Sequence, residues 1–405
     1  MTTTIDSAVR ESAEVWATRR RHGRSIALLT TGVAIFGSLM VFSASTVRSY
    51  TFHRIGYWYL ERHLAALLFG AAIAFVIRVI PGKVWSRMAF MAYLGTCGLQ
   101  VFALIAGAAI GGQSNWINIG FTTIQPSEFL KVGMILGVAQ VLAVQQSRNP
   151  AWQPACTSAV VVGGLAFAFV AVGGDFGTPI VLAAIVYLML FIAGLPGKPL
   201  AYIALFGLVV GATFVAFKGY RMDRISAWFD PFHVKGEAGY QSVHGRYALG
   251  GGGLLGEGLG SGREKWGLLP AAHTDFILAA TGEELGLLGA AAVVAALAGL
   301  IIAIVRLALT LDRPFDRYLC GGIAVWFAVQ ALLNIAMVVG WAPVVGITLP
   351  LVSYGGSSMV ATLAAVGIVL SYCREPGTVP AGMGWLLRRH MSAAGQGASK
   401  TRAAR

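Results

Sequence analysis

The sequence predicts an all-α polytopic membrane protein with about ten transmembrane helices and one long extracytoplasmic loop before the eighth. The first observation is composition. Of the 405 residues, 57% are hydrophobic and only 12% are charged, whereas soluble domains carry about 25% charged residues. The second is a series of apolar runs, most of them near the roughly 20 residues that a helix needs to cross a bilayer. The third is the placement of Lys and Arg between these runs.

The first predicted helix is the apolar run 25–46, which follows a polar, arginine-rich segment. Arginines before an apolar run also mark signal peptides, but this run is long enough to span and more spans follow, so we interpret it as an uncleaved helix. The other predicted spans are 63–80, 86–110, 127–145, 157–173, 177–194, 199–217, 275–305, 318–340 and 350–372. The run 275–305 exceeds about 20 residues, so we expect it to tilt or to project from the bilayer.

The distribution of basic residues predicts the orientation. The short segments on the side of the N-terminus carry most of the Lys and Arg residues, and long loops count less in this rule. Both termini are therefore predicted to be cytoplasmic, in a multi-pass protein of the cytoplasmic membrane. The predicted domains are a cytoplasmic tail (1–24), a transmembrane domain (25–372) that includes an outer loop (218–274), and a cytoplasmic, disordered tail (373–405). The net charge of +13 reflects this topology, and we expect no nucleic-acid partner.

The cysteines indicate neither a disulfide framework nor a zinc site. All four lie in or at the ends of predicted spans and none forms a CxxC motif, namely Cys97, Cys156, Cys320 and Cys373. We interpret them as small core residues. The glycine-rich run 250–260 lacks the GxxxxGK[ST] pattern of a phosphate loop. It is either a flexible surface loop or a site of close backbone approach to a ligand.

Several ionisable residues lie in or beside the predicted spans, where charges are costly and often functional. Glu128 and Lys131 are three residues apart and share a helix face. They form either an internal ion pair that locks helix packing or a site in which Lys131 reaches a ligand phosphate. Asp175 lies between glycines at an outer turn, where a turn or helix-cap role is expected.

The stretch 240–286 brings basic and acidic residues together at the outer face. A glycine-rich loop with Arg246, Arg263 and Lys265 leads to His273 and Asp275, where a helix begins. Asp275 is interpreted either as a helix cap or as a catalytic or ligand-binding carboxylate. For His273 the alternatives are a ligand or base and a structural hydrogen bond. That helix also contains Glu283 and Glu284. Both lie further along the helix axis than Asp275 and point in other directions around it, so neither is expected to reach Asp275 readily.

Four stretches resemble the SEDS family, whose members act in shape, elongation, division and sporulation. They are WINIGFTTIQPSEFLKV (116–132), DFGT (175–178), LPAAHTDFILAATGEELGLLG (269–289) and GITLPLVSYGGSS (346–358). The division members are the more similar ones, because of GEELG, the run from Trp326 to Asn334 and the terminal GGSS. The sequence departs from the family at Asn115 and Thr123, where many members carry a basic residue, and at Gly174, where proline is usual.

The resemblance implies a ten-helix bundle that polymerises lipid II into peptidoglycan glycan strands outside the membrane. It places the family's essential aspartate at Asp275, and it implies a class B penicillin-binding protein and other divisome proteins as partners. Asp275 would then be the general base, and cations would offset the charge of the leaving lipid diphosphate. The substrate-binding candidates are Lys131, Arg246, Arg263, Lys265, His273, Glu128 and Ser357.

Other interpretations remain open from the sequence. No metal-spaced cluster is evident, although a divalent cation such as Mg²⁺ or Mn²⁺ could accompany the diphosphate. The buried charges would also suit a lipid II flippase. An elongation-type polymerase and a scaffold that recruits division proteins are the remaining alternatives. Ser357, in the outer segment 349–358, is more typical of packing or capping than of a nucleophile, because no His–Asp partner accompanies it.

Overall fold

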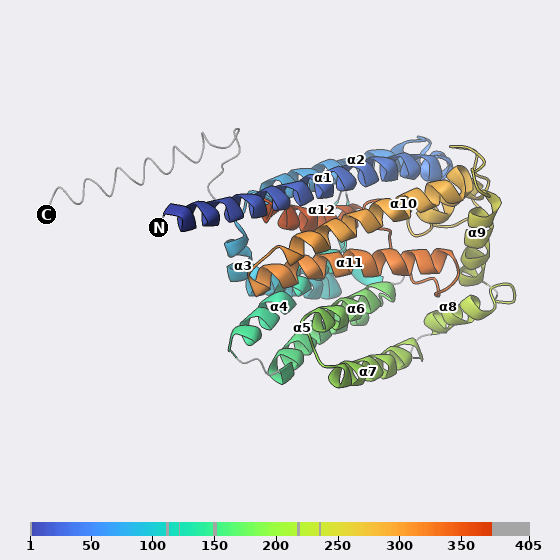
Figure 1. Ribbon diagram of the computed structural model, residues 1–405. Helices are drawn as coiled ribbons and strands as arrows, with labels where there is room; N and C mark the ends of the chain where they lie inside the picture. The colour runs from blue at the N-terminus through green and yellow to red at the C-terminus, as the bar shows by residue number, and fades with distance from the viewer. Residues whose placement is uncertain are drawn as a thin grey trace.

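Ten apolar helices run side by side in the computed structural model, which describes residues 2–110, 113–120, 122–148, 152–216, 219–234 and 236–374 (Figure 1). Among these residues, seven helices are long and apolar enough to cross a membrane, and three shorter apolar helices accompany them. The predicted fold class is confirmed. The ten are α1 (Thr2–His53), α2 (Trp58–Ile77), α3 (Gly82–Ala106), α4 (Pro126–Arg148), α5 (Trp152–Val172), α6 (Gly177–Ile192), α7 (Gly197–Ala216), α10 (Ile277–Leu309), α11 (Pro314–Val338) and α12 (Gly356–Ser371).

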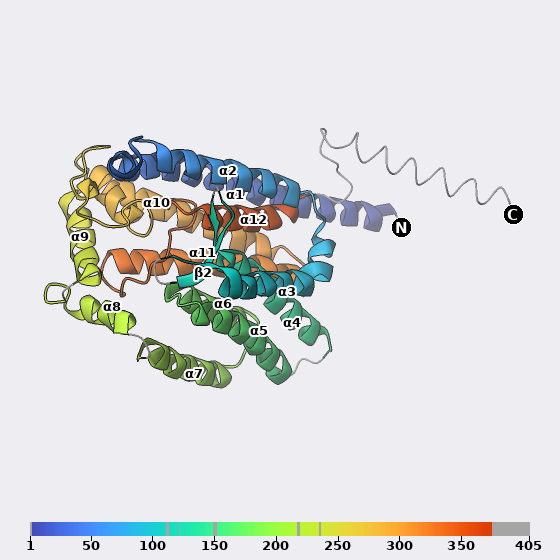
Figure 2. The same ribbon diagram turned by 180° about the vertical axis from the view of Figure 1, so that it is seen from behind.

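The predicted outer loop 218–274 contains helices of its own. It holds α8 (Gly219–Phe229), α9 (Glu237–Gly251) and the short 3-10 helix η1 (Glu264–Trp266). Figures 1 and 2 show α8 and α9 at the end of the bundle opposite the N-terminus. On α8, Arg221 is buried whereas Met222 and Phe229 are exposed. The predicted outer loop is therefore partly helical.

Three short strands were also not predicted. Strands β1 (Ala108–Ile110), β2 (Gln113–Asn118) and β3 (Thr123–Ile124) form an antiparallel sheet in chain order. The predicted span 86–110 ran into β1, but α3 ends at Ala106. A Cβ at Gly107 would lie 2.1 Å from the carbonyl oxygen of Ala103, so this close turn out of the helix requires glycine. Figure 2 shows β2 beside the end of α3.

One predicted tail is helical, and the other lies largely outside the described residues. Helix α1 begins at Thr2, so residues 2–24 of the predicted N-terminal tail are continuous with the first predicted span. Arg19 donates a hydrogen bond to the Thr310 carbonyl and pairs with Asp312 at 3.2 Å, which fixes α1 to the turn between α10 and α11. The predicted disordered tail lies outside the described residues from position 375 onward.

Helices α4 and α11 form the interior of the bundle. In each, 67% of the residues in the most apolar stretch are buried, whereas the corresponding share is 11% for α2 and α7 at the periphery. Because α4 and α11 have little contact with lipid, charged side chains on them face protein rather than hydrocarbon. The predicted last span is shorter than expected, because residues 350–355 form turns before α12.

Helix α10 is interrupted at Gly286, whose φ is 69°. Residues of the glycine-rich run 250–260 form hydrogen bonds with the backbone groups that lose their helical partners at this break. The amides of Glu257 and Gly258 donate to the carbonyls of Glu283 and Glu284 at 2.9 and 3.0 Å, and the Leu287 amide donates to Gly253 at 2.9 Å. A Cβ at Gly256 would lie 2.3 Å from the Glu284 carbonyl oxygen, so the contact excludes other residues. At Gly252 and Gly256 the close approach is to the backbone of α10.

Candidate functional site

Asp275 lies in the turn that leads into α10, at the end of the bundle opposite the N-terminus. Its backbone carbonyl accepts a hydrogen bond of 2.8 Å from the Asn334 side chain, and the Tyr354 amide donates 2.9 Å to the His273 carbonyl. The α10 N-terminus has no side-chain cap, and the Asp275 carboxylate accepts no hydrogen bond from any residue that the structure describes. The helix-cap interpretation is therefore not supported, and the carboxylate is available.

The surroundings of Asp275 tune its charge. Burial raises the pKa of its carboxyl to about 6; the Arg224 guanidinium lowers it and the negative charge of Asp175 raises it. A Cβ at Gly346 would lie 3.6 Å from Asp275 Oδ2 and 3.8 Å from Arg224 Nη1, so the two groups flank this glycine. Arg224 itself donates to the Val344 carbonyl at 2.8 Å. The carboxyl thus titrates close to neutral pH beside a fixed cation.

A row of polar side chains on one face of α11 connects the surroundings of Asp275 with Lys131 on α4. Trp326, Gln330 and Asn334 recur every four residues and so share one face. Gln330 Oε1 accepts from Trp326 Nε1 at 2.7 Å and from Lys131 Nζ at 2.9 Å. Gln330 Nε2 donates a hydrogen bond of 2.9 Å to the Thr348 carbonyl. Thr348 follows two residues after Gly346, the glycine beside Asp275.

Lys131 and Glu128 form the ion pair expected from their spacing. Their charged atoms are 2.8 Å apart, and the side chains are 3% and 8% exposed. With Gln330 as a further acceptor and the Trp326 ring 5.0 Å away, Lys131 has a complete set of protein partners. This geometry supports the structural interpretation of the pair over direct phosphate binding.

None of the three basic residues predicted in the outer loop forms an ion pair or a hydrogen bond with the Asp275 carboxylate among the described residues. Lys265 is buried and pairs with Glu284 at 2.8 Å. The Arg263 side chain is 83% exposed and lies 3.6 Å from the Glu257 carboxylate. Arg246 packs over Gly340, where a Cβ would lie 2.7 Å from its Nε. Arg224, which sequence reasoning did not select, is the cation beside Asp275; its place on an amphipathic run of α8 was the only signal.

His273, Asp175 and Ser357 have structural surroundings. The His273 ring centroid lies 4.6 Å from that of Tyr59, and burial together with the charge of Arg48 lowers its pKa to about 4, so it is neutral at pH 7. Asp175 Oδ1 accepts from the amides of residues 177 and 178, which confirms its predicted cap role. The Ser357 hydroxyl accepts from the Gln125 amide at 2.9 Å, joining α12 to the start of α4.

Two positions at which the sequence departs from the SEDS pattern lie in the short antiparallel sheet. Asn115 is fully buried and accepts 2.7 Å from Gln100 Nε2, and Thr123 lies in β3. The described residues contain no group of three or more His, Cys, Asp or Glu side chains that would hold a metal ion.

Comparison with known proteins identifies the family. Residues 24–376 match the cell cycle protein family that comprises FtsW, RodA and SpoVE. The chain belongs to this family. It is 34% identical over 353 residues to the probable peptidoglycan glycosyltransferase FtsW of Geobacter sulfurreducens, covering 87% of this chain and 95% of the relative. It is 32% identical to the stage V sporulation protein E of Bacillus subtilis, covering 86% and 96%.

Solved structures of this family share the fold. The chain matches one from a peptidoglycan synthase complex that coordinates polymerization and crosslinking, with a TM-score of 0.69, 25% identity and coverage of 86% of this chain and 96% of the other. It matches the rod shape determining protein RodA of Thermus thermophilus with a TM-score of 0.65, 25% identity and coverage of 87% and 97%. These matches confirm the predicted membership of the SEDS family and the greater similarity to FtsW. They also confirm the prediction of a multi-pass membrane protein.

Proposed function

We propose that this chain polymerises lipid II into glycan strands at the outer face of the cytoplasmic membrane during cell division, with Asp275 as the general base. Membership of the family and the names of the FtsW relatives support the peptidoglycan glycosyltransferase class. The observation that carries the proposal within the structure is the Asp275 carboxylate, which has no hydrogen-bond donor among the described residues and a pKa raised to about 6.

The reaction places specific demands on this site. The 4-hydroxyl of one lipid-linked sugar attacks the anomeric carbon of another, with inversion, and the lipid diphosphate leaves with the electrons of the broken C–O bond. Asp275 accepts the hydroxyl proton as the new C–O bond forms. A base is most effective when its pKa lies near the working pH, and a carboxyl with a pKa of about 6 is ionised at pH 7 yet more basic than an ordinary aspartate.

The developing charge on the diphosphate requires cations. We assign this role to Arg224, beside Asp275, and to Arg246, for which no ion pair is found among the described residues. Lys131 and Lys265 are neutralised in buried ion pairs, and Arg263 points to solvent, so these three are left out of the proposed site. A Mg²⁺ or Mn²⁺ ion that enters with the diphosphate would share the work of Arg224 and Arg246.

Purified protein with labelled lipid II tests the proposal. Glycan product, resolved by chain length, is expected from the protein in detergent or liposomes. Translocation of lipid II without polymer would instead support a flippase, and neither activity would support a scaffold. Running the same assay with a class B penicillin-binding protein tests the partner that we propose, for which the similarity to a chain of a peptidoglycan synthase complex is the support. Equal polymerisation with and without that protein would count against it.

We also propose that both termini are cytoplasmic, that η1 and Asp275 face outward, and that the protein acts at the division septum with other divisome proteins. The charge bias supports the orientation. Cysteine labelling tests it, because all four native cysteines are buried. Ser261→Cys, on the exposed outer loop, is expected to react with an impermeant thiol reagent in intact cells, and Lys198→Cys, in the exposed first turn of α7, only after lysis. The reverse pattern would place Asp275 on the wrong side for glycan synthesis.

A further inference from the structure

The first segment of α10 is a short rigid rod that carries Asp275 at its outer end. It extends from residue 277 to 285 and stops at the break at Gly286. At the outer end, Asn334 holds the Asp275 carbonyl. The position of Asp275 therefore depends on what holds the other end of the rod, at Glu284.

Three side chains from three elements meet at that other end. Glu284 pairs with Lys265 of η1 at 2.8 Å, and the Ser43 hydroxyl of α1 donates to Glu284 Oε1 and Oε2 at 2.7 and 2.6 Å. Lys265 Nζ also lies 3.4 Å from Ser43 Oγ, and the Gly260 amide donates to Glu284 Oε2 at 3.1 Å. The side chains of Lys265 and Glu284 are 6% and 1% exposed. We call Ser43, Lys265 and Glu284 the outer clasp.

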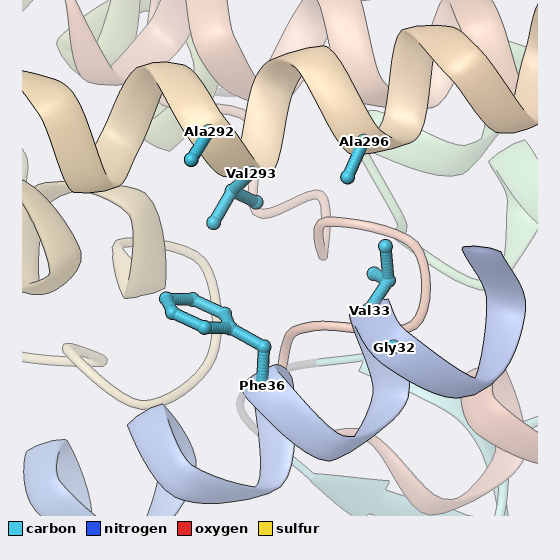
Figure 3. Close-up of a pocket in the computed structure, with 6 residues that line it drawn as sticks. All are labelled: Gly32, Val33, Phe36, Ala292, Val293 and Ala296. Carbon is cyan, nitrogen blue, oxygen red and sulfur yellow. The ribbon is translucent and has the colours of Figure 1, made fainter. Parts of the chain in front are cut away.

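The contact between α1 and the rod differs from the rest of the α1–α10 seam. Further along the two helices, an apolar pocket of about 140 Å³ that is partly open at the surface is lined by side chains from both, as Figure 3 shows: Gly32, Val33, Phe36, Ala292, Val293 and Ala296. Among the described residues, the side-chain hydrogen bonds between α1 and the rod are those of Ser43 with Glu284. The outer clasp is thus the directional polar contact that fixes the rod against α1.

We propose that the outer clasp is a positioning device that holds Asp275 in register with its substrate by fixing the rod of α10 against α1. The proposal rests on the proposed function. It reassigns Lys265, for which its place in the basic outer loop suggested substrate binding, to a role that acts through Glu284. Displacing a reacting group by about 1 Å can cost roughly 100-fold in rate, so loosening the rod is expected to lower turnover more than substrate affinity.

The test compares matched variants by steady-state kinetics on lipid II. Lys265→Met with Glu284→Gln removes both charges together, so that neither is left buried and unpaired. We expect this double variant to fold and to lose about tenfold to 100-fold in kcat, with KM within about threefold of the unmodified protein. Lys265→Arg is expected to retain most of the turnover, because it keeps the cation. Arg263→Met, which removes an exposed charge from the same loop, is the control and is expected to change neither constant.

Two kinetic outcomes would overturn the proposal: an unchanged kcat in the double variant, or a raised KM with unchanged kcat, which would return Lys265 to diphosphate binding. A measurement that does not depend on activity distinguishes failure of the clasp proposal from failure of the proposed function. Spin labels at Thr51→Cys on α1 and Thr274→Cys beside Asp275 report the position of the rod. Their distance distribution is expected to broaden in the double variant and to stay narrow with Arg263→Met. An unchanged distribution would also refute the clasp, whether or not the protein makes glycan.

Discussion

The Asp275→Asn variant is expected to fold, to insert and to bind lipid II, yet to make almost no glycan. Asparagine keeps the size and shape of aspartate but cannot accept the hydroxyl proton, and general-base catalysis contributes typically about 10²–10⁴-fold in rate. A helix cap would behave differently, because Asn caps about as well as Asp. The measurement is polymerisation of labelled lipid II by the purified variant, normalised to folded protein.

A second variant, Asp275→Glu, and the result that would contradict the prediction complete this test. Asp275→Glu retains a base but moves it by one methylene, so partial activity is expected. If Asp275→Asn kept activity within about threefold of the unmodified protein, Asp275 would not be the base, and the flippase interpretation would gain weight.

The pH profile supplies a second signature of the same carboxyl. Its pKa of about 6 means that the basic form dominates at pH 7 and is lost as the pH falls below 6. The rate at low substrate should therefore fall about tenfold per pH unit on the acid side. Asp175→Asn removes a negative charge that raises this pKa and still caps α6, so the acid limb should move to lower pH. An acid limb that stayed in place in both Asp175→Asn and Asp275→Glu would show that another group titrates.

The Lys131→Met variant is expected to lower the free energy of unfolding by about 3–5 kcal/mol. The substitution leaves the Glu128 carboxylate buried without its cation, and the two side chains are only 3% and 8% exposed in the native pair. It also takes a donor from Gln330, which connects α11 to the loop beside Asp275. Thermal unfolding of the purified protein measures the loss.

Two further variants distinguish structural from substrate-binding roles for this pair. Lys131→Met with Glu128→Gln removes both charges and should recover much of the stability, since the lone variant's penalty comes mainly from the unpaired charge. Lys198→Met, at an exposed position in the first turn of α7, is the control, and its free energy of unfolding should stay within about 0.5 kcal/mol of that of the unmodified protein. A stable Lys131→Met protein with a raised KM for lipid II would instead identify Lys131 as a substrate ligand.

Local patterns in the sequence determined most of the transmembrane architecture. Apolar runs of spanning length identify helices because lipid offers backbone groups no partner outside the helix. The same locality explains why the Glu128–Lys131 pair was predictable, since residues three apart on one helix are neighbours whatever surrounds them. Asp175 was predictable as a cap for the same reason: its amide donors lie within three residues of it in the chain.

Only the tertiary structure decided which distant groups meet. Lys265 and Glu284 lie in the same stretch, but their contact depends on a break at Gly286, on the glycine loop that fills it, and on Ser43 from α1, 241 residues away. Arg224 stands beside Asp275 because α8 folds over the end of the bundle. Strands β1–β3 and helices α8 and α9 likewise arise where tertiary packing outweighs weak local preferences. Spacing along the chain carries no information about such contacts, because they form only once separate helices have packed together.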